Sequence, residues 1–119
     1  MRTTDTLANL YIALWNETEP QARREKLDDL WTTDGAYADP LTRGAGHEEI
    51  DALIAGVHRQ FPGFVFQLLN TPDGCGEVMR FAWGLGPGGA EPVVEGTDFC
   101  TIRNGRLHDV VGFIDKIPD

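Results

Sequence analysis

The sequence has few cysteines and no long apolar run. Its two cysteines, Cys75 and Cys100, lack the close spacing of a zinc or redox motif, so we expect packed thiols instead of a disulfide. No apolar run reaches the roughly 20 residues that a membrane span needs, and the N-terminus lacks an apolar signal core. These absences favour a cytoplasmic protein without a membrane segment.

Basic residues are also scarce. The chain has 10 Lys and Arg against 19 Asp and Glu, which gives a net charge of -9. Because an acidic chain without a basic cluster repels phosphate groups, we expect neither a nucleic-acid partner nor a membrane partner. The three histidines, His47, His58 and His108, have no ligand spacing among them, and the sequence therefore predicts no metal site.

What remains is the composition of one folded domain. Hydrophobic residues make up 41% of the 119 residues and charged residues 24%. A chain of this length buries about two-thirds of its unfolded surface around a single core. We therefore expect a single domain over residues 1–119.

Three segments have helical periodicity. The first has an apolar stripe from Leu7 to Trp15, with Asp5 or Thr6 as N-cap. The second has Thr18 as its cap and Pro20 in its first turn, and it ends at residues 34–35. The third begins near His47 and ends at residues 62–63. Its stripe consists of Ile50, Leu53, Ile54, Val57 and Phe61, with His58 on the same face.

Strand patterns dominate the rest of the chain. A short strand is predicted over 36–38, followed by a loop that includes Arg43. Longer strands are predicted over 64–69, 77–85, 93–103 and 107–115, with a turn at 72–74. Asn104-Gly105 is the strongest hairpin signal. This order predicts an α+β fold in which three helices pack on one face of a curved, mostly antiparallel sheet.

Asp39 is the first candidate for chemistry, because it directly precedes Pro40. The proline biases Asp39 towards extended geometry, so its carboxylate projects from a defined bend. A positioned carboxylate in a water-poor pocket can act as a general base. The alternative is an Asp-Pro turn that closes a short strand without any chemical role.

Asp98 is the second candidate. By strand alternation it shares a face with Val94, Gly96, Cys100 and Ile102, so it points towards an apolar side. A carboxyl group there must be paired, hydrogen-bonded or protonated. One partner is Arg80, which a hairpin centred near Gly89 would place opposite Asp98. Such an ion pair would keep Asp98 ionised, and both readings remain open.

Tyr11 and His58 lie on buried helical stripes. The Tyr11 hydroxyl needs a partner, either in simple core packing or as a donor to a substrate oxygen. His58 is either a core histidine or a proton shuttle near Asp39. The large aromatic residues are expected in the core or in a pocket wall: Trp15, Trp31, Phe61, Phe66 and Trp83.

Several short motifs occur along the chain in an order that is typical of a known family. They are Leu10-Tyr11-Ile12, the run from Leu30-Trp31 to Asp39-Pro40, Gly46-His47-Glu48-Glu49-Ile50, Phe61-Pro62-Gly63-Phe64, Gly96-Thr97-Asp98-Phe99 and the run 103–107. Over nearly its whole length the chain resembles the nuclear transport factor 2-like superfamily, in the branch of SnoaL-like polyketide cyclases and ketosteroid isomerases. The resemblance implies a cone-shaped pocket between the helices and the concave face of the sheet, and a homodimer formed through the outer sheet face.

The resemblance to ketosteroid isomerases implies an isomerase, or a cyclase or lyase-like enzyme. Tyr11, Asp39 and Asp98 match the catalytic tyrosine, the aspartate base and the protonated aspartate of that branch. The chemistry implied is proton transfer on a small apolar carbonyl compound without a cofactor. The residues expected to bind the substrate are Trp15, Trp31, Leu53, His58, Phe61, Arg80, Trp83 and Ile114.

The chain departs from that pattern at several positions. Trp31 and Ile54 stand where supporting tyrosines would be, and Ile114 replaces an aromatic residue. An epoxide hydrolase of the same fold would need an Asp-Arg-Asp set, but the Arg-x-Asp strand motif is absent and Gly112 replaces the last aspartate. A further alternative is a non-catalytic module that binds a ligand or assembles as a dimer.

Overall fold

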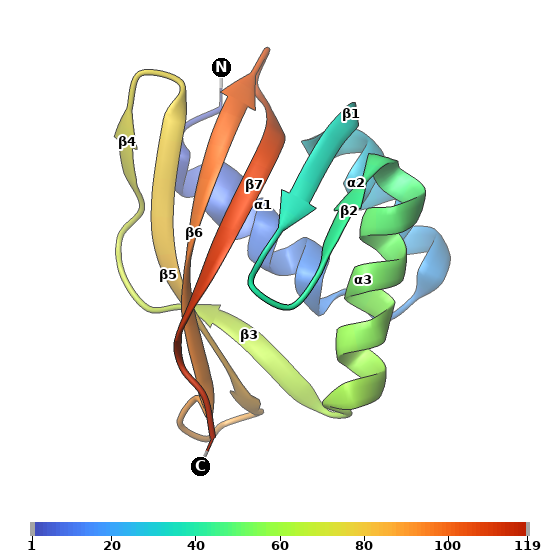
Figure 1. The fold of residues 1–119 in the computed structure, drawn as a ribbon, viewed down its shortest axis with the longest axis vertical. Coiled ribbons are helices and arrows are strands. Elements are labelled where there is room, and N and C mark those ends of the chain that lie inside the picture. Colours follow the sequence, from blue (N-terminus) through green and yellow to red (C-terminus); the bar gives the residue numbers. More distant parts are fainter. Residues whose placement is uncertain (1, 119) are drawn as a thin grey trace.

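The computed structural model describes residues 2–118, in which helices pack on one curved sheet (Figure 1). Met1 and Asp119, the ends of the expected domain, lie outside the described residues. The helices are α1 (Thr4–Asn16), α2 (Pro20–Leu30) and α3 (Gly46–Gln60). The strands are β1 (Trp31–Ala38), β2 (Arg43–Ala45), β3 (Phe64–Leu68), β4 (Asp73–Cys75), β5 (Val78–Pro87), β6 (Val94–Arg103) and β7 (Arg106–Lys116).

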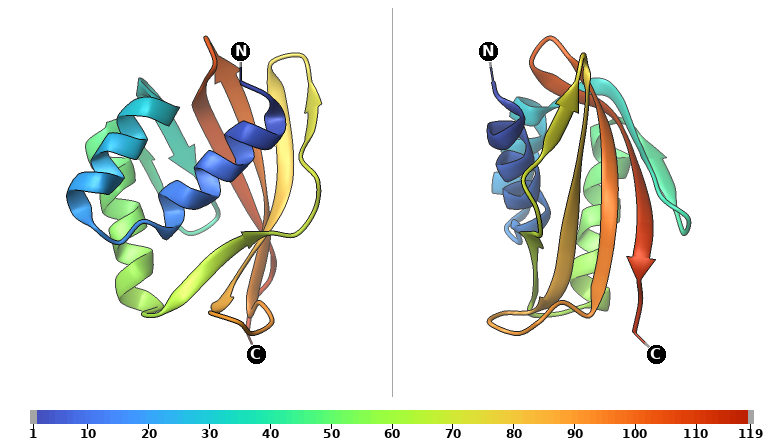
Figure 2. Two further views of the ribbon diagram at one scale, coloured as in Figure 1. Left: turned by 180° about the vertical axis from the view of Figure 1, so that it is seen from behind. Right: turned by 90° about the vertical axis from the view of Figure 1, so that its left-hand side faces the viewer.

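The sheet has the strand order β2-β1-β7-β6-β5-β3, and β4 pairs with β5. Its pairs are antiparallel except for β1 and β7, which run parallel. The edge view in Figure 2 shows that α1 and α2 lie on one side of the curved sheet. This arrangement confirms the predicted α+β class with helices on a curved, mostly antiparallel sheet.

The helix starts differ from the predicted caps. The N-cap of α1 is Thr3, whose hydroxyl accepts the backbone N–H of Thr6 at 3.1 Å. The N-cap of α2 is Glu19, whose carboxylate accepts the backbone N–H of Ala22. In both helices the predicted cap was wrong by one to three residues, because several residues with suitable oxygen atoms precede each apolar stripe.

The largest difference from prediction is the end of α2. The helix ends at Leu30, and β1 begins at Trp31, whereas the sequence predicted helix up to residues 34–35. Trp31 pairs with Leu107 of β7, and its indole N–H donates to the carbonyl oxygen of His108 at 2.8 Å. Pairing with a distant strand therefore ends the helix, and the local helical pattern of this segment does not reveal it.

Two short strands were also missed. The predicted loop at 43–45 is β2, which pairs with β1, and the predicted turn at 72–74 overlaps β4, which pairs with β5. The hairpin at Asn104-Gly105 is confirmed, with φ angles of 54° and 76°. Those angles fit a tight turn in which both central residues adopt positive φ.

The core lies between the helices and the inner face of the sheet. Its fully buried side chains come from helices and strands alike and include Leu7, Leu14, Leu27, Trp31, Ile54 and Phe81. Arg23 of α2 is buried too, and its guanidinium contacts Asp51 of α3 at 2.6 Å. None of the described helices is long and apolar enough to cross a membrane.

Candidate functional site

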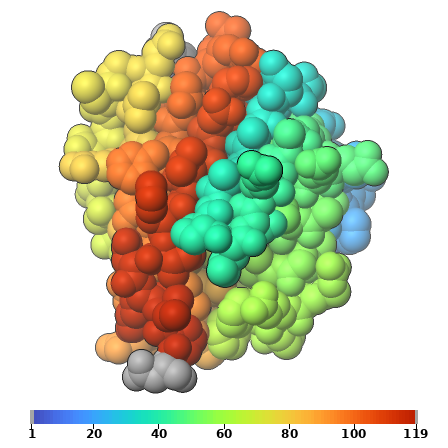
Figure 3. All heavy atoms as spheres, viewed as in Figure 1, coloured from blue at the N-terminus to red at the C-terminus, as the bar shows by residue number. Residues whose placement is uncertain are grey.

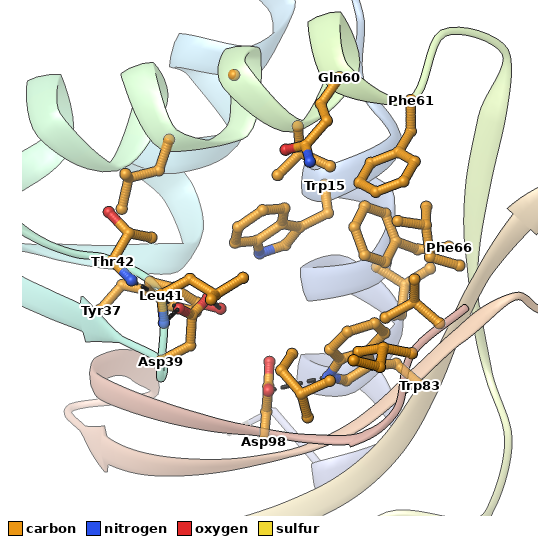
Figure 4. A pocket seen from close by; sticks show the side chains of 18 of the residues that line it. Trp15, Tyr37, Asp39, Leu41, Thr42, Gln60, Phe61, Phe66, Trp83 and Asp98 are labelled. Atoms are coloured by element: carbon orange, nitrogen blue, oxygen red, sulfur yellow. Dashed lines mark hydrogen bonds between the residues drawn. The ribbon is translucent and has the colours of Figure 1, made fainter. Parts of the chain in front are cut away.

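A cavity of about 500 Å³ opens between α1, α3 and the inner face of the sheet (Figure 4). Six aromatic residues line it: Tyr11, Trp15, Tyr37, Phe61, Phe66 and Trp83. Aliphatic side chains from α3 and the C-terminal segment complete most of the wall. Two carboxyl groups line it, those of Asp39 and Asp98. No Lys, Arg or His is among the lining residues within 2–118.

The three residues matched to the isomerase pattern meet at this cavity. Tyr11 comes from α1, Asp39 follows the end of β1, and Asp98 lies on β6, and all three line the same space. Five of the expected substrate-binding residues line it as well: Trp15, Leu53, Phe61, Trp83 and Ile114. Elements far apart in the sequence therefore bring eight of the eleven predicted site residues together.

Trp31 and His58 are outside the cavity. Trp31 is fully buried in the core, where its ring packs on Tyr11 at a centroid distance of 5.8 Å. The His58 ring reaches α1 instead, with Nε2 at 2.6 Å from the carbonyl oxygen of Trp15. The residues that line the cavity therefore do not include these two, and His58 caps a helix end instead.

Arg80 is also outside the cavity, and it does not pair with Asp98. In the register of β5 and β6, Phe81 lies opposite Asp98 and Arg80 lies opposite Phe99. Since strand side chains alternate between faces, this difference of one residue places Arg80 on the outer face. There its guanidinium lies 3.3 Å from the exposed Asp73 carboxylate. The predicted ion pair and the Asp-Arg-Asp set of an epoxide hydrolase are thus absent.

Asp98 is instead held by two neutral donors. The Tyr11 hydroxyl donates to Oδ2 at 2.7 Å, and the Trp83 indole N–H donates to Oδ1 at 2.9 Å. The side chain is buried, with a relative exposure of 2%. Burial raises the pKa of Asp98 to about 6, with a further increase from the charge of Asp39, although both hydrogen bonds act in the opposite direction.

Tyr11 remains a hydrogen-bond donor at ordinary pH. Burial, followed by the neighbouring Asp98 charge, holds the pKa of Tyr11 well above its usual value. Its ring is packed edge-on against Phe81 at 5.4 Å, which fixes the direction of the hydroxyl. A protonated phenol in this position can donate either to Asp98 or to an oxygen atom of a ligand.

Asp39 has a different environment, because most of its partners are in its own turn. Oδ1 accepts the backbone N–H groups of Leu41 at 2.8 Å and Thr42 at 2.9 Å. Oδ2 accepts the Tyr37 hydroxyl at 2.7 Å. The turn predicted as an alternative is therefore present, and the same carboxylate also faces the cavity (Figure 4).

Two partners of these carboxyl groups were missed in the sequence. Trp83 was expected only as a wall residue, yet its indole N–H contacts Asp98. Tyr37 was given no role, although its spacing of two residues from Asp39 is the spacing of side chains on one strand face. That spacing could have predicted the contact between Tyr37 and Asp39.

No metal centre is formed by the described residues, since no three His, Cys, Asp or Glu side chains within 2–118 are grouped as ligands.

Trp15 adds another polar group to the site. Its indole Nε1 is buried and has no hydrogen-bond partner among the residues that the structure describes, and its ring lies next to the Tyr37 ring at a centroid distance of 5.4 Å.

Comparison with known proteins gives one family. The sequence profile described as the SnoaL-like domain matches residues 8–110. A presumed isomerase of the SnoaL-like family from Agrobacterium tumefaciens is 40% identical, with a TM-score of 0.88, over 92% of this chain and 95% of that one. No curated protein matches the chain.

Two more distant structures share the fold. A presumed ketosteroid isomerase from Kribbella flavida is 18% identical, with a TM-score of 0.71, over 98% of this chain and 80% of that one. A presumed polyketide cyclase from Sinorhizobium meliloti is 19% identical, with a TM-score of 0.69, over 89% of this chain and 92% of that one. At these identities the likeness concerns the fold alone.

Proposed function

The chain belongs to the SnoaL-like domain family, and on that premise we propose that it is an enzyme that transfers a proton on a small apolar carbonyl compound. One observation carries the proposal. Two carboxyl groups with different hydrogen-bond partners, Asp39 and Asp98, face one aromatic cavity of about 500 Å³. Carboxyl groups whose environments differ in this way are suited to separate acid and base roles.

Asp39 is the base in this reaction. Its carboxylate takes a proton from the carbon next to the substrate carbonyl, and the electrons of the C–H bond move to the carbonyl oxygen. The enolate then takes a proton back from Asp39, at the same or another carbon. The backbone donors from Leu41 and Thr42 hold the carboxylate in place before and after the transfer.

Tyr11 and Asp98 bind the developing oxyanion. Both line the cavity, and both can donate a hydrogen bond when Asp98 is protonated. The pKa of Asp98, raised to about 6 by burial, allows the protonated form at mildly acidic pH. A bound apolar ligand excludes water from the cavity and favours that neutral form further.

The cavity supports a small substrate with a largely apolar body. Its volume lies within the roughly 300–1,000 Å³ of typical ligand pockets. The proposed steps use only side chains of this chain, so they need no cofactor. The proposal extends to isomerases and cyclases alike, because both begin with the same abstraction of a proton.

Deuterium exchange tests the proposal without a known product. Small cyclic ketones and diketones are incubated with the protein in D₂O, and loss of the proton next to the carbonyl is followed by NMR. We expect the protein to accelerate exchange for members that fit the cavity. Binding of these compounds without any exchange would contradict the proposal and support the non-catalytic ligand-binding alternative.

A further inference from the structure

Tyr37 is a buried residue whose hydroxyl group has no part in the proposed steps. It lies near the end of β1, with a relative exposure of 6%, and its ring packs against Trp15. Its hydroxyl donates to Oδ2 of Asp39 at 2.7 Å. Replacing this residue would therefore change the surroundings of the proposed base without touching its backbone turn.

The hydrogen-bond acceptor positions of Asp39 show how the contact with Tyr37 constrains its carboxylate. An ionised carboxylate offers about four lone-pair positions, two on each oxygen. On Oδ1, the N–H groups of Leu41 and Thr42 occupy two of them. On Oδ2, Tyr37 occupies one, and no other residue within 2–118 donates to the second. The oxygen with spare acceptor capacity is therefore Oδ2, on a carboxylate that faces the cavity.

The Tyr37 ring packs against Trp15, and its hydroxyl lies where Gly112 leaves room. A Cβ atom built on Gly112 of β7 would lie 3.4 Å from the Tyr37 hydroxyl and 2.6 Å from Oδ1 of Asp98. The missing side chain at Gly112 thus gives both polar groups room at one point of the sheet. With Trp15 on the other side, the Tyr37 ring has a fixed position from which to donate.

We propose that Tyr37 is a positioning residue that fixes the Asp39 carboxylate so that the free lone pair of Oδ2 receives the substrate proton. This inference rests on the proposed function. In the step, the C–H bond breaks, an O–H bond forms at Oδ2, and the electron pair moves to the carbonyl oxygen. Tyr37 keeps its own proton throughout.

The charges around Tyr37 favour that role. The titratable groups that act on it are Asp98 and Cys100 of β6, Asp39 in the following turn, and Tyr11 of α1. Burial and the two carboxyl groups hold the pKa of Tyr37 far above its usual value, so the hydroxyl stays a donor. Tyr37 is consequently unsuited to act as a base itself.

The test compares Tyr37→Phe with a matched control, Thr97→Val. Thr97 also donates a hydroxyl to a carboxylate at 2.7 Å, but its partner is the exposed Asp115, and Thr97 does not line the cavity. The first readout needs no substrate. The ¹³C NMR signal of the Asp39 carboxyl group, assigned by its loss in Asp39→Asn, should shift in Tyr37→Phe and stay unchanged in Thr97→Val.

The second readout is kinetic, on any ketone that the wild-type protein exchanges. Tyr37→Phe should lower kcat about 10-fold or more and leave KM nearly unchanged, as expected when an interaction that acts in the transition state is lost. Thr97→Val should retain the wild-type kcat. Unfolding curves of both variants verify that they are folded, since Phe keeps the packed ring.

The two readouts separate the possible failures. An unchanged Asp39 signal in Tyr37→Phe would overturn the contact itself. A shifted signal with an unchanged kcat would overturn the positioning role. If the wild-type protein exchanges no ketone while the signal shifts, the contact stands, whereas the proposed function and the catalytic use of Tyr37 both fall.

Discussion

At the scale of single residues, the site depends on how differently two aspartates are held. Asp39 accepts two backbone N–H groups and one hydroxyl at the cavity, whereas Asp98 is buried and accepts from the side chains of Tyr11 and Trp83. Burial favours the neutral acid at Asp98, whereas the three donors around Asp39 fix the direction of its carboxylate. The same residue type can therefore supply a base at one position and a hydrogen-bond donor at the other.

Burial of Asp98 predicts a specific dependence of stability on pH. Its pKa is raised from 3.8 to about 6 on folding, so the folded state binds this proton more tightly than the unfolded state. The stabilisation is complete below about pH 4 and is lost as the pH rises through 6, with a total of about 3 kcal/mol. The amide side chain of Asp98→Asn does not titrate in this pH range, so this variant is the reference.

The measurement is urea unfolding of both proteins between pH 4 and pH 7, the range in which the folded and unfolded forms differ in protonation. The free energy of unfolding of the wild-type protein, relative to that of Asp98→Asn, should fall by about 2–3 kcal/mol over this range. A difference that is constant with pH would show that Asp98 does not titrate as described.

The sequence was enough to predict most residues of the site, but it did not predict which side chains contact one another. Asp39 stood out because a proline follows it, and Asp98 because a carboxyl group interrupts an apolar strand face. The choice of partner for Asp98 depended on the strand register. An error of one residue in that register exchanged Arg80 for the neutral donors Tyr11 and Trp83.

At the scale of elements, the pairing of β6 with β7 creates the room that the site needs. Asp98 lies opposite Gly112 in this pair, and the Tyr37 hydroxyl approaches the same point from β1. Parallel pairing of β1 with β7 is what brings Tyr37 there. Gly112, which stands where an epoxide hydrolase of the same fold has an aspartate, is thus required for the packing of this site.

Gly112→Ala should therefore disturb the carboxyl pair. The new Cβ would lie 2.6 Å from Oδ1 of Asp98, so the carboxyl group must move away from Trp83 or Tyr11. We expect a loss of about 1–3 kcal/mol in the free energy of unfolding, and a loss of ketone exchange.

The control is Gly88→Ala, because a Cβ at Gly88 meets no atom within 4 Å and its backbone is not in the left-handed region. Its stability should stay within about 0.5 kcal/mol of wild type, the usual range for a surface substitution. If Gly112→Ala were equally harmless, the close packing described here would be wrong.

Element boundaries show where local sequence patterns stop being informative. The hairpin at Asn104-Gly105 and the span of α3 follow from local signals, and both are confirmed. The early end of α2 and the short strands β2 and β4 depend on partners far along the chain. Non-local pairing decides such segments, so a local pattern cannot predict them.

At the scale of the whole molecule, the outer face of the sheet is the counterpart of the cavity. Phe99 of β6 and Phe113 of β7 pack edge-to-face there at 5.8 Å, and they remain 37% and 51% exposed. Val111 beside them is also exposed. Figure 3 shows the β6 and β7 side chains open to the surface on this face.

We propose that two copies of the chain associate through this face, because an exposed apolar cluster marks an interaction surface. Phe113→Asp would place a charge in the contact, and each copy already carries a net charge of -9. Sedimentation velocity over a range of concentrations should give a dimer for wild type and a monomer for the variant. Gln21→Asp, an exposed position on α2 on the opposite side of the sheet, adds the same charge and is the control that should remain dimeric. A monomeric wild-type protein would contradict this arrangement.

The central claim is that Asp39 removes a proton from a ligand in the cavity. The most direct measurement is the rate of deuterium exchange next to the carbonyl of the best ketone, in wild type, Asp39→Asn and Thr97→Val. We predict that Asp39→Asn slows exchange by about 100-fold or more while still binding the ketone, since general bases contribute factors of this size, and that Thr97→Val matches wild type. Exchange at the wild-type rate in Asp39→Asn would contradict the account.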